Sequence, residues 1–133
     1  KYNFAYQRKQ GYLKFLKQKK IKLKKDYYIS VKNEDPDDSA QQIKKLILKN
    51  SKITAIICST EYSAAGAIKA LNQINKKIGK DISLISFDGS VVNSISSPSI
   101  TAVTHDRKQL GKRIQLRGIP RQRHLMPLDP ILI

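Results

Sequence analysis

The sequence predicts an α/β fold in which helices flank a mostly parallel sheet. Apolar stretches of strand length alternate with segments whose apolar residues recur at helical spacing. The two clearest strands, at 53–58 and 82–87, each end in small polar residues. Strands and helices alternating at these lengths favour a parallel sheet with right-handed crossovers. Open sheets of this kind bind ligands outside the carboxyl ends of their strands, so we look for function there.

The first half of the chain predicts two helices around one strand. Residues 5–18 have aromatic and aliphatic side chains three and four positions apart, which indicates a helix. The segment 26–31 is rich in tyrosine, isoleucine and valine, which is typical of a strand. After an acidic loop, Pro36 suits the first turn of a helix that we expect to reach about residue 49. The apolar face of that helix consists of Ala40, Ile43, Leu46 and Ile47.

The second half continues the alternation and adds one loop. Its predicted elements are a strand at 53–58, a helix at about 61–77, a strand at 82–87, an irregular serine-rich loop at 89–99, a strand at 100–104 and the start of a helix at 106–113. The stretch 112–122 fits no element, because it is short and carries Gly118 and Pro120.

The chain is strongly basic, with a formal net charge of +16. Much of the charge lies in a lysine-rich linker after the first helix, at Lys17, Lys19, Lys20, Lys22, Lys24 and Lys25. This run has two interpretations: a solvated surface segment, or a contact with a polyanion such as nucleic acid. No aromatic residues interleave with the run, so a platform for stacking single-stranded bases is not indicated.

Nothing in the sequence predicts catalysis, a metal site or a cofactor. The two histidines, His105 and His124, have no partners at metal-ligand spacing, and the nucleophile-elbow pattern of hydrolases does not occur. Cys58 stands alone in an apolar strand, where it is expected to be a small buried side chain, in keeping with a reducing compartment. No apolar run is long enough to cross a membrane, and no signal peptide is visible.

Four segments resemble the effector-binding core of the LacI/GalR family of transcriptional repressors. They are Arg-Lys-Gln-Gly-Tyr at 8–12, Thr-Ala-Ile-Ile-Cys-Ser-Thr-Glu at 54–61, Asp-Ile-Ser-Leu-Ile-Ser-Phe-Asp at 81–88 and Ser-Pro-Ser-Ile-Thr-Ala-Val at 97–103. The resemblance covers roughly residues 5–111 and implies part of a doubly wound fold of the periplasmic-binding-protein type I class. It also implies a homodimer that binds a small effector, usually a sugar or nucleobase, and operator DNA through an N-terminal helix-turn-helix.

Carried over by motif, the resemblance implies four ligand-binding residues: Arg8, Thr60, Asp88 and His105. Arg8 would offer a fork of donors, and Asp88 would accept from ligand hydroxyls. Thr60 stands where the family has a ligand-contacting asparagine, and His105 where many members have glutamine. Structural alternatives remain open for three of them: Asp88 could satisfy loop amides, Arg8 could be a surface residue, and Thr60 could be a helix N-cap.

The resemblance also implies that the chain is part of a longer protein. The strand that should precede the first helix would lie between 26–31 and 53–58 in a sheet of order 2-1-3-4-5. That strand is not in the sequence, and residue 1 is not Met, so we expect the intact protein to extend further at its N-terminus. Residues 1–104 would form the C-terminal subdomain, 105–122 a segment crossing toward the other subdomain, and 123–133 the closing strand.

Three functions compete at this point. The first is the sensor core of a cytoplasmic, sugar-responsive repressor, and the segment at 97–103 favours it. The second is a periplasmic sugar-binding protein of the same fold that feeds an ABC transporter. The third is a basic nucleic-acid-binding module that acts through the lysine run.

Overall fold

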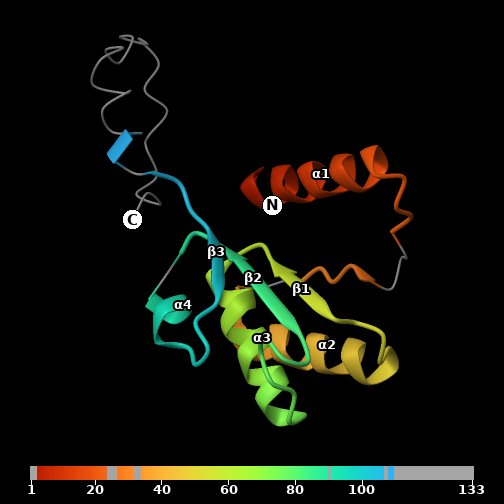
Figure 1. The fold of residues 1–133 in the computed structure, drawn as a ribbon, viewed down its shortest axis with the longest axis vertical. Helices are drawn as coiled ribbons and strands as arrows, with labels where there is room; N and C mark the ends of the chain where they lie inside the picture. Colours follow the sequence, from red (N-terminus) through yellow and green to blue (C-terminus); the bar gives the residue numbers. More distant parts are fainter. Residues whose placement is uncertain (1–2, 24–26, 32–33, 90, 107, 110–133) are drawn as a thin grey trace.

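The computed structural model describes residues 3–23, 27–31, 34–89, 91–106 and 108–109. Helices and strands alternate along them from residue 36 onward (Figure 1). The elements are α1 (Asn3–Gln18), α2 (Pro36–Lys49), β1 (Ala55–Cys58), α3 (Glu61–Gln73), β2 (Ser83–Phe87), α4 (Val91–Ile95) and β3 (Thr101–Val103).

The three described strands form one parallel sheet in the order β1-β2-β3, which confirms the predicted parallel α/β fold. Cys58 of β1 pairs with Ser86 of β2, and Phe87 of β2 pairs with Val103 of β3. The carboxyl ends of all three strands therefore lie at one edge of the sheet.

Local sequence sets the ends of the helices. Asp35 caps α2, because its side chain accepts a hydrogen bond from the backbone N–H of Asp37 at 2.8 Å, and Pro36 opens the helix. The helix predicted at 61–77 ends earlier, at Gln73. Asn75 takes a left-handed conformation with φ 54°, and the N–H of Lys76 donates to the carbonyl of Leu71. This Schellman pattern stops the helix without a glycine.

One face of the sheet packs against α2 and α3 and contains the main core. Small residues of α3, among them Ala64, Ala67 and Ala70, are fully buried there. Gly66 lets the start of α2 approach, since a Cβ at this position would lie 2.5 Å from Ser39 Cβ and 2.6 Å from the carbonyl oxygen of Pro36. The core cluster consists of Ala40, Ile43, Ile47, Cys58, Ala64, Ala67, Ala70, Leu71, Ile82, Leu84 and Ile100.

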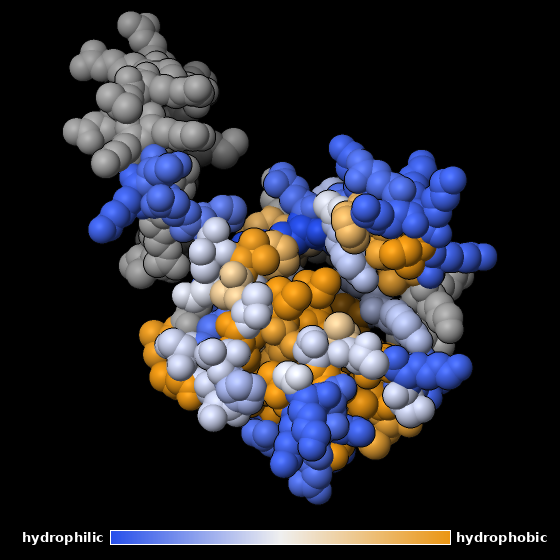
Figure 2. Space-filling view, in the orientation of Figure 1, coloured by the Kyte–Doolittle hydropathy of each residue, from blue (hydrophilic) through white to orange (hydrophobic). Residues whose placement is uncertain are grey.

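The opposite face of the sheet turns toward α1. The strands lie between α1 and the α2–α3 layer (Figure 1). Side chains on this face alternate with the core residues, and Ile57 and Val103 remain 50% and 47% exposed. Figure 2 shows apolar surface beneath α1 and a hydrophilic outer surface on α1 itself. Helix α1 thus covers this face only in part.

Two predicted elements are wrong in the described residues. The strand expected at 26–31 is absent from 27–31, although Ile29 packs against the core. An extended segment needs a paired neighbour to become a strand, and no described strand lies at the outer edge of β1. The loop expected at 89–99 contains the short helix α4. Asn93 of this helix is buried and donates to the hydroxyl of Ser86 at 2.8 Å, and its carbonyl accepts from the N–H of Ile100.

The remaining predictions differ only in bounds or lie outside the described residues. The strands expected at 53–58, 82–87 and 100–104 are each shorter, as β1, β2 and β3. Residues 110–133 lie outside the described part of the chain, and with them most of the helix expected from 106 and of the segments 105–122 and 123–133. None of the described helices combines the length and apolar character that a bilayer crossing requires.

Candidate functional site

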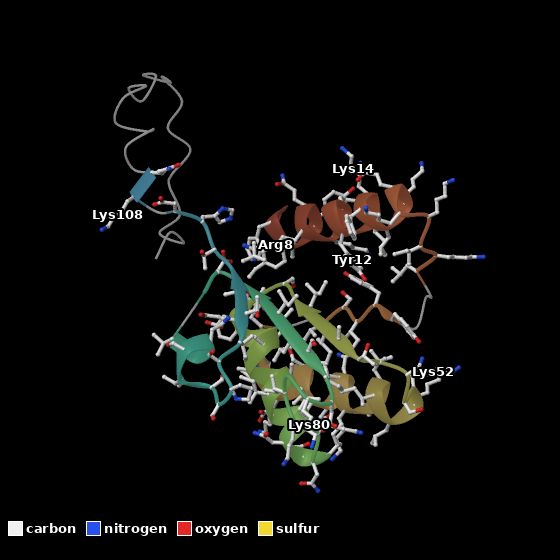
Figure 3. The ribbon with its side chains drawn as sticks, viewed as in Figure 1. Arg8, Tyr12, Lys14, Lys52, Lys80 and Lys108 are labelled. Carbon is white, nitrogen blue, oxygen red and sulfur yellow. The ribbon has the colours of Figure 1, made fainter. Side chains whose placement is uncertain are left out.

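Arg8 connects α1 to the carboxyl ends of two neighbouring strands. Its Nη1 donates to the carbonyl oxygen of Ser59, just after β1, at 2.5 Å. Its Nη2 donates to Asp88 Oδ2, just after β2, at 2.6 Å. Figure 3 shows Arg8 and Tyr12 on the side of α1 that faces the sheet. The Arg8 side chain is only 15% exposed, so the structure excludes a role as a free surface residue.

Two aromatic rings hold the guanidinium of Arg8 in place. The Phe87 ring centroid lies 4.6 Å from its Cζ, and the Phe4 ring centroid lies 5.0 Å from the same atom. Such contacts add cation–π attraction and restrict the orientation of the planar group. Arg8 therefore presents its donors in one direction, at the edge of the sheet.

Asp88 occupies the turn that follows β2. Its backbone has φ 66°, a left-handed conformation that aspartate tolerates better than most residues. Its N–H donates to the carbonyl of Val103 at 2.9 Å, which ties the end of β2 to the end of β3. The side chain is 44% exposed, and Oδ1 forms no hydrogen bond to the described residues. One carboxylate oxygen thus holds Arg8, and the other is left as an acceptor on a part-exposed side chain.

Thr60 caps the helix that follows β1. Its Oγ1 accepts from the N–H of Ser63 at 3.2 Å, and Ser63 Oγ accepts from the N–H of Thr60 at 3.1 Å. This reciprocal pair is a capping box, which confirms the N-cap alternative for Thr60. The two hydroxyl oxygens also lie 3.0 Å apart. A ligand that approached Thr60 would therefore meet a hydroxyl already fixed by Ser63.

His105 lies two positions beyond β3 and is exposed. It makes no hydrogen bond, ion pair or ring contact with the described part of the chain. The strand order places it at the same edge of the sheet as Asp88, on the strand next to β2. Of the four predicted residues, Arg8 and Asp88 are in direct contact, and the other two flank them on neighbouring strand ends.

The register places Thr60 and Asp88 after strand ends that lie side by side. Cys58 pairs with Ser86, and each predicted residue stands two positions beyond its member of this pair. Sequence reasoning missed three parts of the site: the carbonyl of Ser59, Phe87 and Phe4. Phe87 precedes Asp88 directly, so strand alternation could have placed it on the face opposite Ser86. Phe4 and the Ser59 carbonyl give no comparable signal in the sequence.

Cys58, at the end of β1, is buried in the core. Burial raises the pKa of the Cys58 thiol to about 12. A hydrogen bond with the Ser63 side chain lowers this pKa, but by less than burial raises it. Cys58 is therefore a protonated, unreactive thiol. Among the residues that the structure describes, no group of three or more His, Cys, Asp and Glu side chains is arranged to hold a metal ion.

The family profile for the periplasmic binding protein-like domain matches residues 2–116. A transcriptional repressor, PurR of Mannheimia succiniciproducens, is 27% identical over 109 residues, which cover 82% of this chain and 32% of the repressor. The ribose operon repressor of Halalkalibacterium halodurans is 32% identical over 93 residues, 69% of this chain and 28% of that protein. The chain spans about a third of the length of the curated relatives it matches.

A solved structure shares both sequence and fold with this chain. It is a sugar-binding transcriptional regulator of the LacI family from Escherichia coli, in complex with phosphate. Its identity is 25% and its TM-score 0.68, over 79% of this chain and 37% of that one. The match to the family profile, the repressor relatives and this fold agree with one another. The chain belongs to the family of periplasmic binding protein-like domains, in the form that regulators of the LacI/GalR type use as their effector-binding core.

Proposed function

We propose that this chain is the effector-sensing core of a LacI-type transcriptional regulator. The observation that carries the proposal is the contact of Arg8 with Ser59 and Asp88 at the carboxyl ends of β1 and β2. This edge is where open α/β sheets bind ligands. Because the curated relatives quoted above are repressors, the comparison favours a regulator over a receptor that feeds an ABC transporter.

The polar groups at this edge match a small polar effector such as a sugar. Asp88 Oδ1 accepts hydrogen bonds, and Arg8 has N–H donors beyond the two already used. A sugar hydroxyl both donates and accepts, so one ligand can engage both side chains. Thr60 and His105 are proposed to flank it. A related regulator is described as sugar-binding, and another as a repressor of a ribose operon, which supports this ligand class.

Effector binding would act on the position of α1 relative to the sheet. Arg8 connects α1 by hydrogen bonds to Ser59 and Asp88, just after the carboxyl ends of β1 and β2. A ligand that shares the donors of Arg8 and the acceptor of Asp88 binds some arrangements of α1 more tightly than others. It therefore shifts the population toward those arrangements. The shift in free energy cannot exceed the difference between its binding free energies for the favoured and the disfavoured arrangements.

The rest of the regulator belongs to the same proposal. Operator DNA would be read by a helix-turn-helix outside this chain, and two subunits would form a homodimer. The protein would work in the cytoplasm, where the operator lies. It would bind its effector without chemical change, because it needs no catalytic group, cofactor or metal ion for this role.

A thermal-shift screen of sugars, sugar phosphates and nucleosides tests the proposal. A ligand present at 100 times its Kd stabilises the folded state by about 2.7 kcal/mol, which raises the melting temperature. We expect a sugar to give such a shift, and Asp88→Ala to abolish it. Glu61→Ala is the matched control, because Glu61 is an exposed acid at the neighbouring strand end. A panel without any active compound, or an unchanged shift in Asp88→Ala, would contradict the proposal.

A further inference from the structure

We propose that a basic surface at the end of α1 binds the phosphate backbone of duplex DNA. The basic surface consists of Lys14, Lys17, Lys19, Lys20 and Lys22. This function goes beyond effector sensing and does not involve the Arg8–Asp88 contact. It would add affinity for DNA that does not depend on base sequence.

The surface is an unbalanced concentration of positive charge. Residues 3–23 contain seven basic side chains and no acidic one. All five lysines of the basic surface are exposed, and none forms an ion pair with the described residues. Figure 3 shows Lys14 on the side of α1 that points away from the sheet. Figure 2 shows that the outer surface of α1 is hydrophilic.

Stabilisation of the carboxyl end of α1 explains only some of the lysines in the basic surface. Cations stabilise the carboxyl end of a helix, but this effect is confined to its last turn. Lys14 lies before that turn and Lys22 beyond the helix, so neither is explained in this way. Elsewhere on the molecule a lysine has a carboxylate partner: Lys69 contacts Asp37 at 2.6 Å. The lysines of the basic surface repel one another, and no carboxylate of the described residues pairs with them.

The chemistry of the surface favours duplex DNA over other polyanionic partners. Lysines act as point charges on phosphates and do not read bases. Phe15 is the one aromatic residue between Lys14 and Lys22, with Lys19 Nζ 6.0 Å from its ring centroid, and a single ring does not form the series of stacking surfaces that single strands use. A membrane-surface helix turns its apolar face to the lipid, whereas in α1 Leu16 is buried at 7% exposure and Tyr12 lies on the side that faces the sheet (Figure 3), although Phe15 and Ile21 are exposed. The choice of DNA over RNA rests on the proposed function.

Titration of a short DNA duplex of arbitrary sequence at several salt concentrations tests the inference. Five phosphate contacts predict a slope of about −4.5 for log K against log salt, and a loss of affinity of about 500-fold between about 50 and 200 mM salt. Changing Lys17, Lys19, Lys20 and Lys22 to Gln should reduce the slope by about 3.6. Circular dichroism checks that this fourfold variant is folded. The single changes Lys14→Gln and Lys22→Gln should each reduce the slope by about 0.9.

A second variant separates the basic surface from net charge. Changing Lys45, Lys76, Lys77 and Lys80 to Gln removes the same charge from exposed positions elsewhere. Figure 3 places Lys80 at the opposite end of the molecule from Lys14. The control should keep most of the slope. Equal losses in both variants, no binding by the wild type, or binding to phosphatidylserine vesicles but not to DNA would overturn the inference. None of these results depends on effector binding.

Discussion

Cys58 shows how a single buried side chain links sequence to stability. It lies at the end of β1, in the core and 3% exposed, where desolvation disfavours the thiolate. The hydrogen bond with the Ser63 side chain offsets only part of this effect. The folded state therefore keeps the thiol proton to much higher pH than the unfolded chain does. As a result, the free energy of unfolding falls as the pH rises through the alkaline range.

Replacing Cys58 by Ala should remove this dependence. In the unfolded chain the thiol ionises near its usual pKa of 9.0, whereas the folded thiol ionises near 12. Above pH 9 the unfolded state binds fewer protons, so the wild type loses about 1.4 kcal/mol of unfolding free energy per pH unit relative to Cys58→Ala. Urea denaturation of both proteins at pH 8, 9 and 10 measures the difference. A difference that stays constant across this range would show that the thiol is not desolvated.

At the scale of elements, α2 and α3 depend on one glycine. Gly66→Ala should destabilise the protein, because the new Cβ would overlap the backbone of Pro36 and Ala40 as well as the side chain of Ser39. The better helix propensity of alanine offsets about 1 kcal/mol, and overpacking of this kind costs about 1–3 kcal/mol or more. The expected net loss is therefore up to about 2 kcal/mol in chemical denaturation.

Gly11→Ala is the matched control for that substitution. Gly11 is also inside a helix, but nothing lies within 4 Å of the position that its Cβ would take. It should therefore gain about 0.5–1 kcal/mol of stability. If both substitutions stabilised the protein, the close packing of α2 on α3 would be refuted.

Which elements could be predicted depended on where their determinants lie. The bounds of α2 follow from Asp35 and Pro36, both of which act locally, and 36–49 was predicted correctly. The segment 26–31 has strand-like composition, but a strand also needs a partner, which composition does not reveal. Helix α4 depends on the contact of Asn93 with Ser86 from another element, so its serine-rich sequence resembled a loop.

The same distinction applies to the candidate site. Thr60 and Asp88 could be placed together from strand periodicity and the carboxyl-end rule, and the pairing of Cys58 with Ser86 shows that the strands before them end side by side. Arg8 came from the family resemblance, and its contact with Asp88 joins residues 80 positions apart. The rings of Phe4 and Phe87 around its guanidinium depend on how α1 lies on the sheet, which periodicity does not determine.

At the scale of the whole molecule, the sheet separates two kinds of surface. On one side α2 and α3 form a closed core of small and aliphatic residues. On the other side, where α1 lies (Figure 1), Ile57 and Val103 of the sheet remain exposed, and Arg8 of α1 contacts Asp88 just after β2. The tightly packed side gives rigidity, and the less packed side gives room for α1 to respond to a ligand. This asymmetry is what the proposed sensing mechanism requires.

The most direct test of the sensing role is a crystal structure with the sugar that the screen identifies. We predict ligand oxygens within about 2.7–3.2 Å of both the Arg8 guanidinium and the Asp88 carboxylate. The ligand should lie outside the carboxyl ends of β1 and β2, next to Thr60. A bound sugar that touches neither Arg8 nor Asp88 would contradict the account.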